Sequence, residues 1–222
     1  CGYDRYLQLV APFFPDKPSI ATGMTREVER CRLALDAAAG GKTVAVVCSG
    51  DAGVYGMAGL IYQLSGEYPP VEIEVIPGVS AAMAGAAVLG APLMHDFAVI
   101  SLSDLLTPWA AIDARLRGAA AAGFVLCLYN PASKKRADYL ARACDLVLEH
   151  RSPDTVCGWV RNIGRAGQES AVLTLAELRQ WRAAPFSPAL LCNAHPPLAP
   201  DKTGTPPAVG GPPPRTHPPL HA

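Results

Sequence analysis

Apolar residues recur along this chain at two spacings, and each spacing predicts a different element. Spacings of three and four positions, as at Val28, Cys31 and Leu35, are typical of an amphipathic helix. Short, uniformly apolar runs such as residues 43–48 are typical of parallel strands covered on both faces. The first half alternates between these patterns, which predicts a βαβ unit with a right-handed crossover. The expected elements are a short helix after Gly2, a helix over 25–39, a strand over 43–48, a helix over 57–64, a strand over 71–76 and a helix from 81 to about 90.

The alternation starts again near residue 95, where we place a domain boundary. Thr107 and Pro108 are typical of a helix start, with a hydroxyl N-cap before proline at the first helical position. This second domain, residues 96–193, is expected to have strands over 98–102, 124–129, 155–160 and 189–193, and helices over 107–122 and 133–149.

The last part of the chain differs in composition. Twelve of the 22 prolines fall at or after Pro185, and few apolar residues recur at a regular spacing. Such a segment cannot offset its ordering entropy by burial. We therefore predict that residues 194–222 form a disordered tail.

Charge and cysteine usage narrow the classes of protein. The 19 basic and 19 acidic residues and a pI near 7.1 give no electrostatic footprint for nucleic acid or an anionic membrane. The apolar runs, about five to eight residues long, are far shorter than the roughly 20 residues of a membrane span. The seven cysteines include no Cys-x-x-Cys pair, so we expect reduced, mostly buried thiols and a cytoplasmic location. The chain begins at Cys1 rather than Met, so we expect its natural N-terminus to lie upstream.

Two glycine-containing segments lack the spacing of nucleotide-binding loops. Before Gly41-Lys42-Thr43, Asp36 stands where a phosphate loop requires glycine, and the segment enters a predicted strand instead of leaving one. The glycines of Ser49–Gly56 do not have the Gly-x-Gly-x-x-Gly spacing of dinucleotide sites. A plain tight turn is the simplest interpretation of that segment when it is taken alone.

Several segments nevertheless place small polar or charged residues directly after an apolar run, where a core would normally continue. Strand ends of this kind open into ligand sites in α/β proteins. The segments are Ser49–Gly56, Pro77–Ala81, Ser101–Asp104, Tyr129–Pro131 and Arg161–Arg165.

In this order the segments resemble the tetrapyrrole (precorrin) methyltransferase family, and most closely its precorrin-3B C17-methyltransferases. The resemblance covers roughly residues 1–180. It implies an α/β fold of two lobes, a mainly parallel N-terminal sheet and a mixed C-terminal sheet, with the active cleft between them. The family's first strand and its Gly-Pro-Gly cofactor loop are absent from this sequence.

The resemblance implies S-adenosylmethionine as methyl donor. Glycines allow close approach of the backbone to a ligand, and the Asp51 carboxylate can offset a sulfonium or bond a hydroxyl or ammonium. Ala52 stands where family members often have proline. The residues expected to bind the cofactor are Ser49, Gly50, Asp51, Val54, Tyr55, Ser80, Ala81, Tyr129, Asn130 and Asn162.

The run Ser101-Leu-Ser-Asp104 resembles the ring-contracting members. Ring contraction moves a proton and an oxygen substituent, so Ser103 and Asp104 are expected to be catalytic; a turn that caps its own backbone is the alternative. Arginines can bind substrate carboxylates through bidentate bonds, and a solvated surface charge is the alternative for each of them. The residues expected to bind substrate are Ser101, Arg136, Arg161 and Arg165. No metal-binding cluster or nucleophile–base pair stands out.

The implied function is transfer of a methyl group from S-adenosylmethionine to C17 of precorrin-3B, with ring contraction to precorrin-4 in cobalamin biosynthesis. The expected partner is a small tetrapyrrole, without nucleic acid or membrane, and the expected assembly is a homodimer. Three alternatives remain: cobalt-precorrin-3 or another precorrin methyltransferase, a ribosomal RNA methyltransferase of the same superfamily, and a non-catalytic fragment. The absence of a basic patch disfavours the RNA enzyme.

Overall fold

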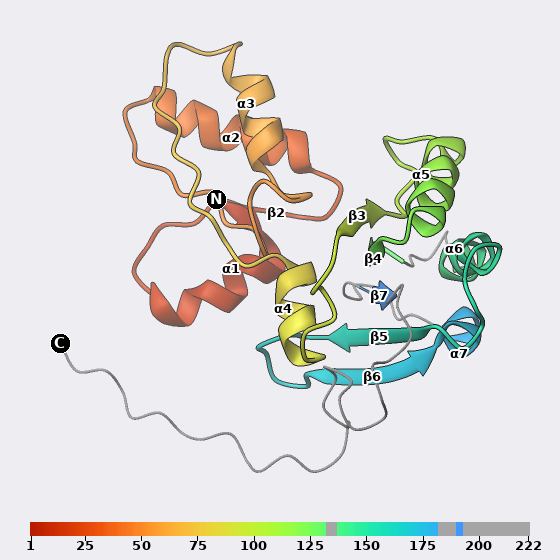
Figure 1. Cartoon of the computed structure of the whole chain (residues 1–222). Coiled ribbons are helices and arrows are strands. Elements are labelled where there is room, and N and C mark those ends of the chain that lie inside the picture. Colours follow the sequence, from red (N-terminus) through yellow and green to blue (C-terminus); the bar gives the residue numbers. More distant parts are fainter. Residues whose placement is uncertain (132–136, 182–189, 193–222) are drawn as a thin grey trace. The chain divides into compact units, whose positions relative to one another are not determined.

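The computed structural model describes residues 1–131 and 137–181 and the backbone of residues 190–192. The predictions for residues 132–136, 182–189 and 193–222, including those for Arg136 and the tail, lie outside this part of the chain. The chain divides into two compact units, Cys1–Ala81 and the part from Ala82 onward (Figure 1).

Two helices form the core of the first unit. Cys31 and Leu35 of helix α2 (Glu27–Ala39) pack against Ile61 and Leu64 of helix α3 (Ala58–Ser65), at the helical spacing that the sequence predicted. Burial raises the pKa of the Cys31 thiol to about 11, so this thiol stays protonated at neutral pH. The elements are β1 (Gly2–Tyr3), α1 (Asp4–Val10), the 3-10 helix η1 (Ala11–Phe13), β2 (Ala21–Thr22), α2 (Glu27–Ala39) and α3 (Ala58–Ser65).

The two strands predicted over 43–48 and 71–76 do not form, so the prediction of a βαβ unit is wrong. Residues 43–48 run beside the N-terminus with a single parallel bridge, Gly2–Val47, and the regular sheet consists only of the short β1–β2 pair. Val71 and Ile73 still pack against the helical core. The apolar pattern thus predicted the partial burial of Val71 and Ile73. A strand also requires a partner backbone with which to form hydrogen bonds.

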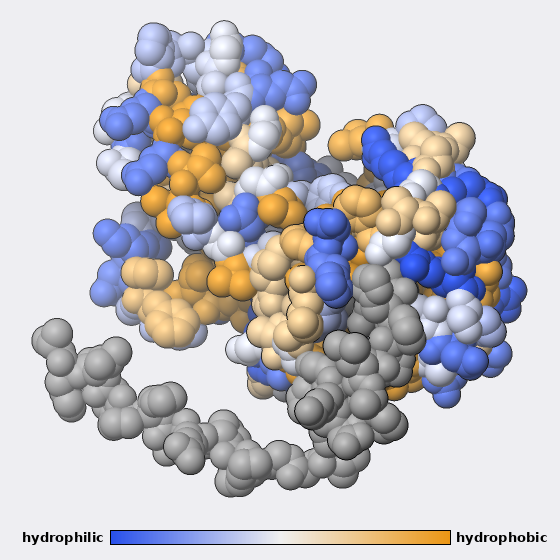
Figure 2. Space-filling model, in the orientation of Figure 1, coloured by the Kyte–Doolittle hydropathy of each residue, from blue (hydrophilic) through white to orange (hydrophobic). Residues whose placement is uncertain are grey.

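The boundary between the units falls after Ala81, upstream of the position near residue 95 expected from the sequence. The reason is α4 (Ala81–Val88), because its residues Ala82 and Ala86 pack in one cluster with Val160 of the second unit's sheet. Figure 2 shows that α4 also carries apolar surface, to which the exposed Met83 belongs.

A mixed five-stranded sheet forms the centre of the second unit, as the resemblance implied. Its strand order is β3-β4-β7-β5-β6; the β3–β4 pair is parallel and the other three pairs are antiparallel (Figure 1). The strands are β3 (Phe97–Ser101), β4 (Val125–Tyr129), β5 (Val156–Arg161), β6 (Glu169–Thr174) and β7 (Leu190–Cys192), and the helices are α5 (Trp109–Ala121), α6 (Tyr139–Leu148) and α7 (Leu175–Gln180).

Both faces of this sheet are covered. Alternate residues of β4 point to opposite faces: Leu126 and Leu128 pack in the cluster formed with α5, α6 and α7, whereas Cys127 packs with α4. A uniformly apolar strand is expected in this position.

Two local predictions in this unit were wrong or incomplete. The N-cap of α5 is Pro108 and no side chain caps this end, so the predicted Thr107 cap is wrong. The sequence analysis also missed β6 and α7, although α7 begins with a capping box. Thr174 Oγ1 accepts from the Glu177 amide at 3.2 Å, and Glu177 Oε2 accepts from the Thr174 amide at 2.7 Å. The spacing Thr-x-x-Glu was the available signal.

The described cysteines form no disulfide. Cys31, Cys127, Cys144 and Cys157 are buried, which confirms the predicted burial of these four. Within the described residues, no helix is long and apolar enough to cross a membrane.

Candidate active site

In the first unit, one carboxylate joins two of the predicted cofactor segments. Asp51 Oδ1 accepts from the Gly53 amide at 2.8 Å, within its own turn. Asp51 Oδ2 accepts from the Gly78 amide at 2.9 Å, in the Pro77–Ala81 turn. These amide bonds, first the one from Gly78 and then the one from Gly53, lower the pKa of the Asp51 carboxyl, which is therefore ionised at neutral pH. Segments 49–53 and 77–81 thus form one local structure.

The backbones of these two turns are in direct contact. A Cβ on residue 78 would lie 2.2 Å from the Gly50 carbonyl oxygen, so only glycine fits there. Gly50 itself has φ +78°, a conformation that favours glycine, and lies against the backbone of Ser80. Ser80 is buried and directly precedes α4, which begins at Ala81. The structure therefore brings together Ser49, Gly50, Asp51, Ser80 and Ala81 of the predicted cofactor set.

Exposed apolar side chains accompany the Asp51 carboxylate. Val54 and Tyr55 follow it in the same turn, and Val79 follows Gly78 in the other turn; all three are exposed. Tyr55 has φ 54°, an uncommon conformation for a residue with a side chain. An ionised carboxylate beside apolar surface and closely approachable backbone suits a ligand that has both a charged and an apolar part.

In the second unit, three strands end at one edge of the sheet. Ser101 and Tyr129, the last residues of β3 and β4, are paired in register. β7 pairs antiparallel with both β4 and β5, so β5 runs parallel to β4 and its last residue, Arg161, lies at the same edge. Ligands of open α/β sheets bind at such carboxyl ends. The fold thus brings Ser101, Asn130 and Arg161 to one edge.

Hydrogen bonds connect the predicted residues at this edge. Asn130 Nδ2 donates to Ser101 Oγ at 3.0 Å, and the Ser103 amide donates to the same oxygen at 3.2 Å. Tyr129 Oη accepts from the Ala82 amide at 2.8 Å, which satisfies a donor in the first turn of α4. Asn130 has φ 53°, so it sits in a left-handed turn at the strand end. Ser101 therefore holds the loop that carries Ser103 and Asp104.

Asp104 has a partner that the sequence analysis missed. Tyr139, the first residue of α6, donates its hydroxyl to Asp104 Oδ2 at 2.6 Å, and this bond raises the pKa of the Tyr139 phenol. The next residues, Leu105 and Leu106, are 74 % and 98 % exposed. Exposed leucines beside a hydrogen-bonded carboxylate offer apolar contact to a flat ligand together with a polar group. Nothing in the spacing of Asp104 and Tyr139 along the chain indicated this bond.

The last of the five predicted segments, Arg161–Arg165, is held largely by hydrogen bonds within its own loop. Asn162 Nδ2 donates to the Gly167 carbonyl at 3.1 Å, and the Asn162 carbonyl accepts from the Arg165 amide at 2.9 Å. Arg161 lies 3.7 Å from the Glu169 carboxylate. These contacts give Asn162 and Arg161 structural partners, and their ligand roles stay predictions.

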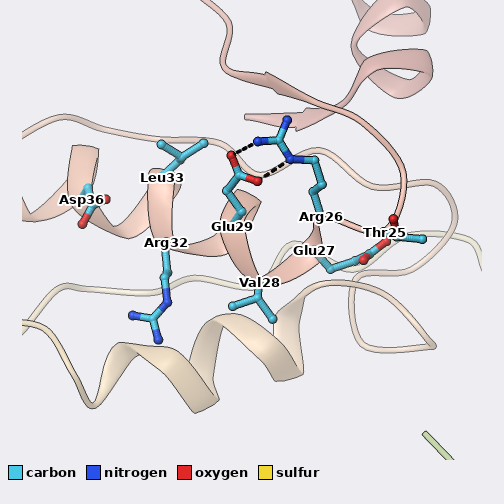
Figure 3. Close-up of a pocket in the computed structure, with 8 residues that line it drawn as sticks. All are labelled: Thr25, Arg26, Glu27, Val28, Glu29, Arg32, Leu33 and Asp36. Carbon is cyan, nitrogen blue, oxygen red and sulfur yellow. Dashed lines mark hydrogen bonds and ion pairs between the residues drawn. The ribbon is translucent and has the colours of Figure 1, made fainter. Parts of the chain in front are cut away.

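A separate pocket lies on α2 in the first unit. Its lining contains none of the predicted site residues: Thr25, Arg26, Glu27, Val28, Glu29, Arg32, Leu33 and Asp36. Figure 3 shows Arg26 and Glu29 paired with each other beside it. Arg26 pairs with Glu29, and Arg32 pairs with Glu67. Because no predicted site segment lines this pocket, we place the candidate site at the turns and at the sheet edge instead.

These features are those of an α/β protein that has polar strand ends in one unit and a glycine–aspartate turn in the other, both typical of small-molecule sites. The chain belongs to the tetrapyrrole (corrin/porphyrin) methylases, whose family model matches residues 1–179. It is 50 % identical over 178 residues to a probable cobalt-factor III C(17)-methyltransferase of Salmonella typhimurium, covering 80 % of this chain and 74 % of that protein.

Two other relatives and a solved structure are similar. A precorrin-3B C(17)-methyltransferase of Sinorhizobium sp. is 41 % identical over 186 residues, covering 82 % of this chain and 73 % of that protein. The cobalt-factor III methyltransferase of Priestia megaterium is 46 % identical, and this chain spans only 34 % of its length. The crystal structure of the methyltransferase CobJ matches with a TM-score of 0.76 and 32 % identity, covering 86 % of this chain and 81 % of that one. The predicted family and fold are thereby confirmed.

Proposed function

We propose that this chain transfers a methyl group from S-adenosylmethionine to C17 of precorrin-3B, with ring contraction to precorrin-4 in cobalamin biosynthesis. The similarity to two proteins named as C(17)-methyltransferases, over at least 80 % of this chain, carries the proposal. The Ser101–Asp104 segment supports it, because this run resembles the ring-contracting members and lies at the sheet edge with an exposed carboxylate.

The Gly50–Asp51 and Gly78–Ser80 turns fit the methyl donor. Their glycines expose backbone that a ligand can approach closely, and the ionised Asp51 carboxylate suits the donor's positive charge. Asp51 Oδ1 accepts the Gly53 amide and Oδ2 accepts the Gly78 amide, and a carboxylate has about four lone-pair sites for hydrogen bonds. A solved relative with a TM-score of 0.60 and 19 % identity, a uroporphyrin-III C-methyl transferase from Thermus thermophilus, is described as complexed with S-adenyl homocysteine.

The protein's main contribution to methyl transfer is orientation. S-adenosylmethionine supplies the electrophilic methyl group when it is bound. Alignment of the reacting atoms can be worth up to roughly 7–11 kcal/mol in ideal cases, and it requires rigid supports such as the paired turns. In this proposal, Asp104 at the sheet edge accepts a proton or a hydrogen bond from the macrocycle, and Ser103 donates one. Leu105 and Leu106 would pack on the macrocycle's apolar face.

A cobalt-containing substrate is the second candidate. The Salmonella protein, at 50 % identity, is named for cobalt-factor III, and the Sinorhizobium protein, at 41 % identity, for precorrin-3B. Turnover of both macrocycles with S-adenosylmethionine, followed by mass spectrometry, separates the two. One added methyl group with the contracted ring is the expected product.

Two results would contradict the proposal. Methylation of neither macrocycle by a chain that binds S-adenosylmethionine would point to a different tetrapyrrole substrate. Failure to bind S-adenosylmethionine in a calorimetric titration would favour the alternative of a non-catalytic fragment.

A homodimer and a cytoplasmic location belong to the same proposal. The first rests on the family resemblance and the second on the sequence, whose seven cysteines include no Cys-x-x-Cys pair. Multi-angle light scattering measures the mass in solution, and the mass of a single chain would exclude the dimer.

A further inference from the structure

Arg142 of α6 lies on a platform of two aromatic rings. Its guanidinium carbon is 4.0 Å from the ring centroid of Trp109, the first residue of α5, and 5.0 Å from that of Tyr139, the first residue of α6. The two rings are themselves 4.6 Å apart and inclined at 57°. Trp109 also packs against the main core of the unit. Stacking on anchored rings fixes a guanidinium and leaves its N–H edges available.

Other arginines of this unit have carboxylate partners. Arg117 pairs with Asp113 and Glu149, Arg179 pairs with Asp145, and Arg161 lies near Glu169; the Arg179 and Arg161 pairs approach to 2.5 Å and 3.7 Å. The Arg142 guanidinium stacks on the two rings and forms no hydrogen bond or ion pair with the part of the chain that the structure describes, whereas the Arg142 backbone amide donates to the Asp138 carbonyl at 2.9 Å. Its five N–H donors remain available to a ligand, and their planar fork matches a carboxylate.

The platform stands beside the candidate catalytic carboxylate. Tyr139 contacts Arg142 with its ring and donates its hydroxyl to Asp104. The loops that follow β3 and β4 lead to Trp109 and Tyr139, so the platform lies at the carboxyl ends of the strands. The first turns of α5 and α6 contain no acidic residue, and no side chain caps either helix. The positive end of α5 begins at Trp109, on which Arg142 stacks, whereas the N-cap residue of α6 is the acidic Asp138.

We propose that Arg142, stacked on Trp109 and Tyr139, binds a carboxylate side chain of the macrocyclic substrate. The inference rests on the proposed function, because tetrapyrrole precursors carry acetate and propionate groups around an apolar ring. The arrangement separates two tasks at one edge of the sheet. Arg142 anchors a peripheral carboxylate, and Asp104, held by Tyr139, faces the ring itself. Arg142 is therefore a substrate-binding residue that fixes the position of the macrocycle relative to Asp104.

Substitution of Arg142 by Gln or by Met tests this role. Both changes remove the charge and the fork, and Met keeps an unbranched apolar side chain that can still pack on the rings. Arg179→Gln is the matched control, because it removes the same charge from an arginine of the same unit that has its own partner, Asp145. The measurements are KM and kcat for precorrin-3B, the dissociation constant of S-adenosylmethionine and the melting temperature.

We expect a KM for precorrin-3B about tenfold higher in both Arg142 variants, as for the loss of a charge-assisted hydrogen bond. Affinity for S-adenosylmethionine and the melting temperature should stay close to those of the wild type, and Arg179→Gln should leave KM within about twofold. Arg142→Lys should recover part of the loss, since it keeps the charge without the fork. In the wild type, KM should rise with salt, and this dependence should be weaker in Arg142→Met.

A KM within twofold of wild type in both Arg142 variants overturns the inference, and a lower melting temperature alone assigns Arg142 to packing on the rings. Binding of uroporphyrin III, a stable tetrapyrrole polycarboxylate, is measured separately from turnover. If the wild type turns over no precorrin-3B, the proposed function fails. In that case the carboxylate-binding role of Arg142 is supported only if the wild type binds this porphyrin more tightly than Arg142→Gln does. Equal binding by the two proteins contradicts this role.

Discussion

Asp51 shows how a single side chain can be both a structural and a functional residue. Its two carboxylate oxygens each accept one backbone amide, from Gly53 and from Gly78, so the two turns share one acceptor group. An ionised carboxylate in this position is compatible with the sulfonium charge of the proposed donor. Sequence reasoning selected Asp51 for the cofactor, but it did not show that the same residue holds the second turn in place.

Replacement of Asp51 should weaken the binding of S-adenosylmethionine for any acceptor. Asp51→Ala removes both amide bonds and the charge, and we expect about a tenfold loss of affinity or more. Asp51→Asn should lose less, because one of its two terminal atoms can still accept an amide. Calorimetry measures the affinities, with the exposed Asp16→Asn as control. Unchanged affinity in Asp51→Ala would leave this carboxylate with a purely local role.

Replacement of Asp104 should affect turnover of the macrocycle and not the binding of S-adenosylmethionine. We expect Asp104→Ala to lower kcat and kcat/KM for precorrin-3B by about 10²–10⁴-fold, the usual cost of removing a positioned acid or base. The affinity for S-adenosylmethionine should be unchanged. Tyr139→Phe removes only the 2.6 Å hydrogen bond to Asp104 and should reduce kcat by a smaller factor. Near-normal turnover in Asp104→Ala would assign this residue to its turn and remove the only candidate catalytic carboxylate.

At the scale of elements, helices were predicted more reliably than strands. The spacing of apolar residues, such as Cys31 and Leu35 in α2, shows which face of a helix is buried. This spacing is sufficient for a helix, because a helix forms its backbone hydrogen bonds within itself. Residues 71–76 have the apolar pattern of a strand, yet their backbone has no ladder partner, and a partner is a property of the fold. The capping box at Thr174 was a local signal that the sequence analysis overlooked.

The candidate site was predicted where it depends on local backbone chemistry. Glycine and small polar residues after strands pointed to Gly50, Asp51, Ser101 and Asn130, and the structure places them at turns or at the sheet edge. Trp109, Tyr139 and Arg142 were missed, because aromatic and basic residues at helix starts also suit ordinary packing. Their relation to one another arises only when α5 and α6 lie side by side.

The contact between the two turns gives a prediction for Gly78. Gly78→Ala forces its Cβ to within 2.2 Å of the Gly50 carbonyl, so the two turns must separate. We expect weaker S-adenosylmethionine binding and a lower melting temperature. Gly59→Ala is the control, because it lies within α3 with open space around its Cβ, and alanine stabilises a helix by about 1 kcal/mol relative to glycine. Equal behaviour of the two variants in thermal unfolding and calorimetry would show that the turns tolerate separation.

At the scale of the whole molecule, the second unit depends on a strand beyond the family match. That match ends at residue 179, whereas β7 begins at Leu190 and lies between β4 and β5. β4 and β5 have no ladder with each other, so β7 connects two halves of the sheet. A chain shortened to the matched residues 1–179 would lose this connection.

Truncation at two neighbouring positions tests the role of β7. A chain that ends at residue 189 should lose the cooperative unfolding of the second unit and aggregate, because β4 and β5 then both become exposed edges. A chain that ends at residue 192 keeps Leu190–Cys192 and should retain the melting temperature of the full chain. Circular dichroism and light scattering compare the two. A stable, monodisperse 1–189 chain would mean that β7 is dispensable.

The central place of β7 also affects how the protein is made on the ribosome. β3–β4 and β5–β6 are complete in the nascent chain before β7, and the segment between Thr174 and Leu190 takes about one to three seconds to synthesise at 5–20 residues per second. During that interval both halves of the sheet expose unpaired amides and carbonyls to the crowded cytosol. The sheet can form completely only after Leu190–Cys192 has been synthesised. Its formation then pairs residues far apart in the chain, which is slow. Translation therefore exposes this sheet to misassembly for a fixed interval, whose length is set by the rate of the ribosome.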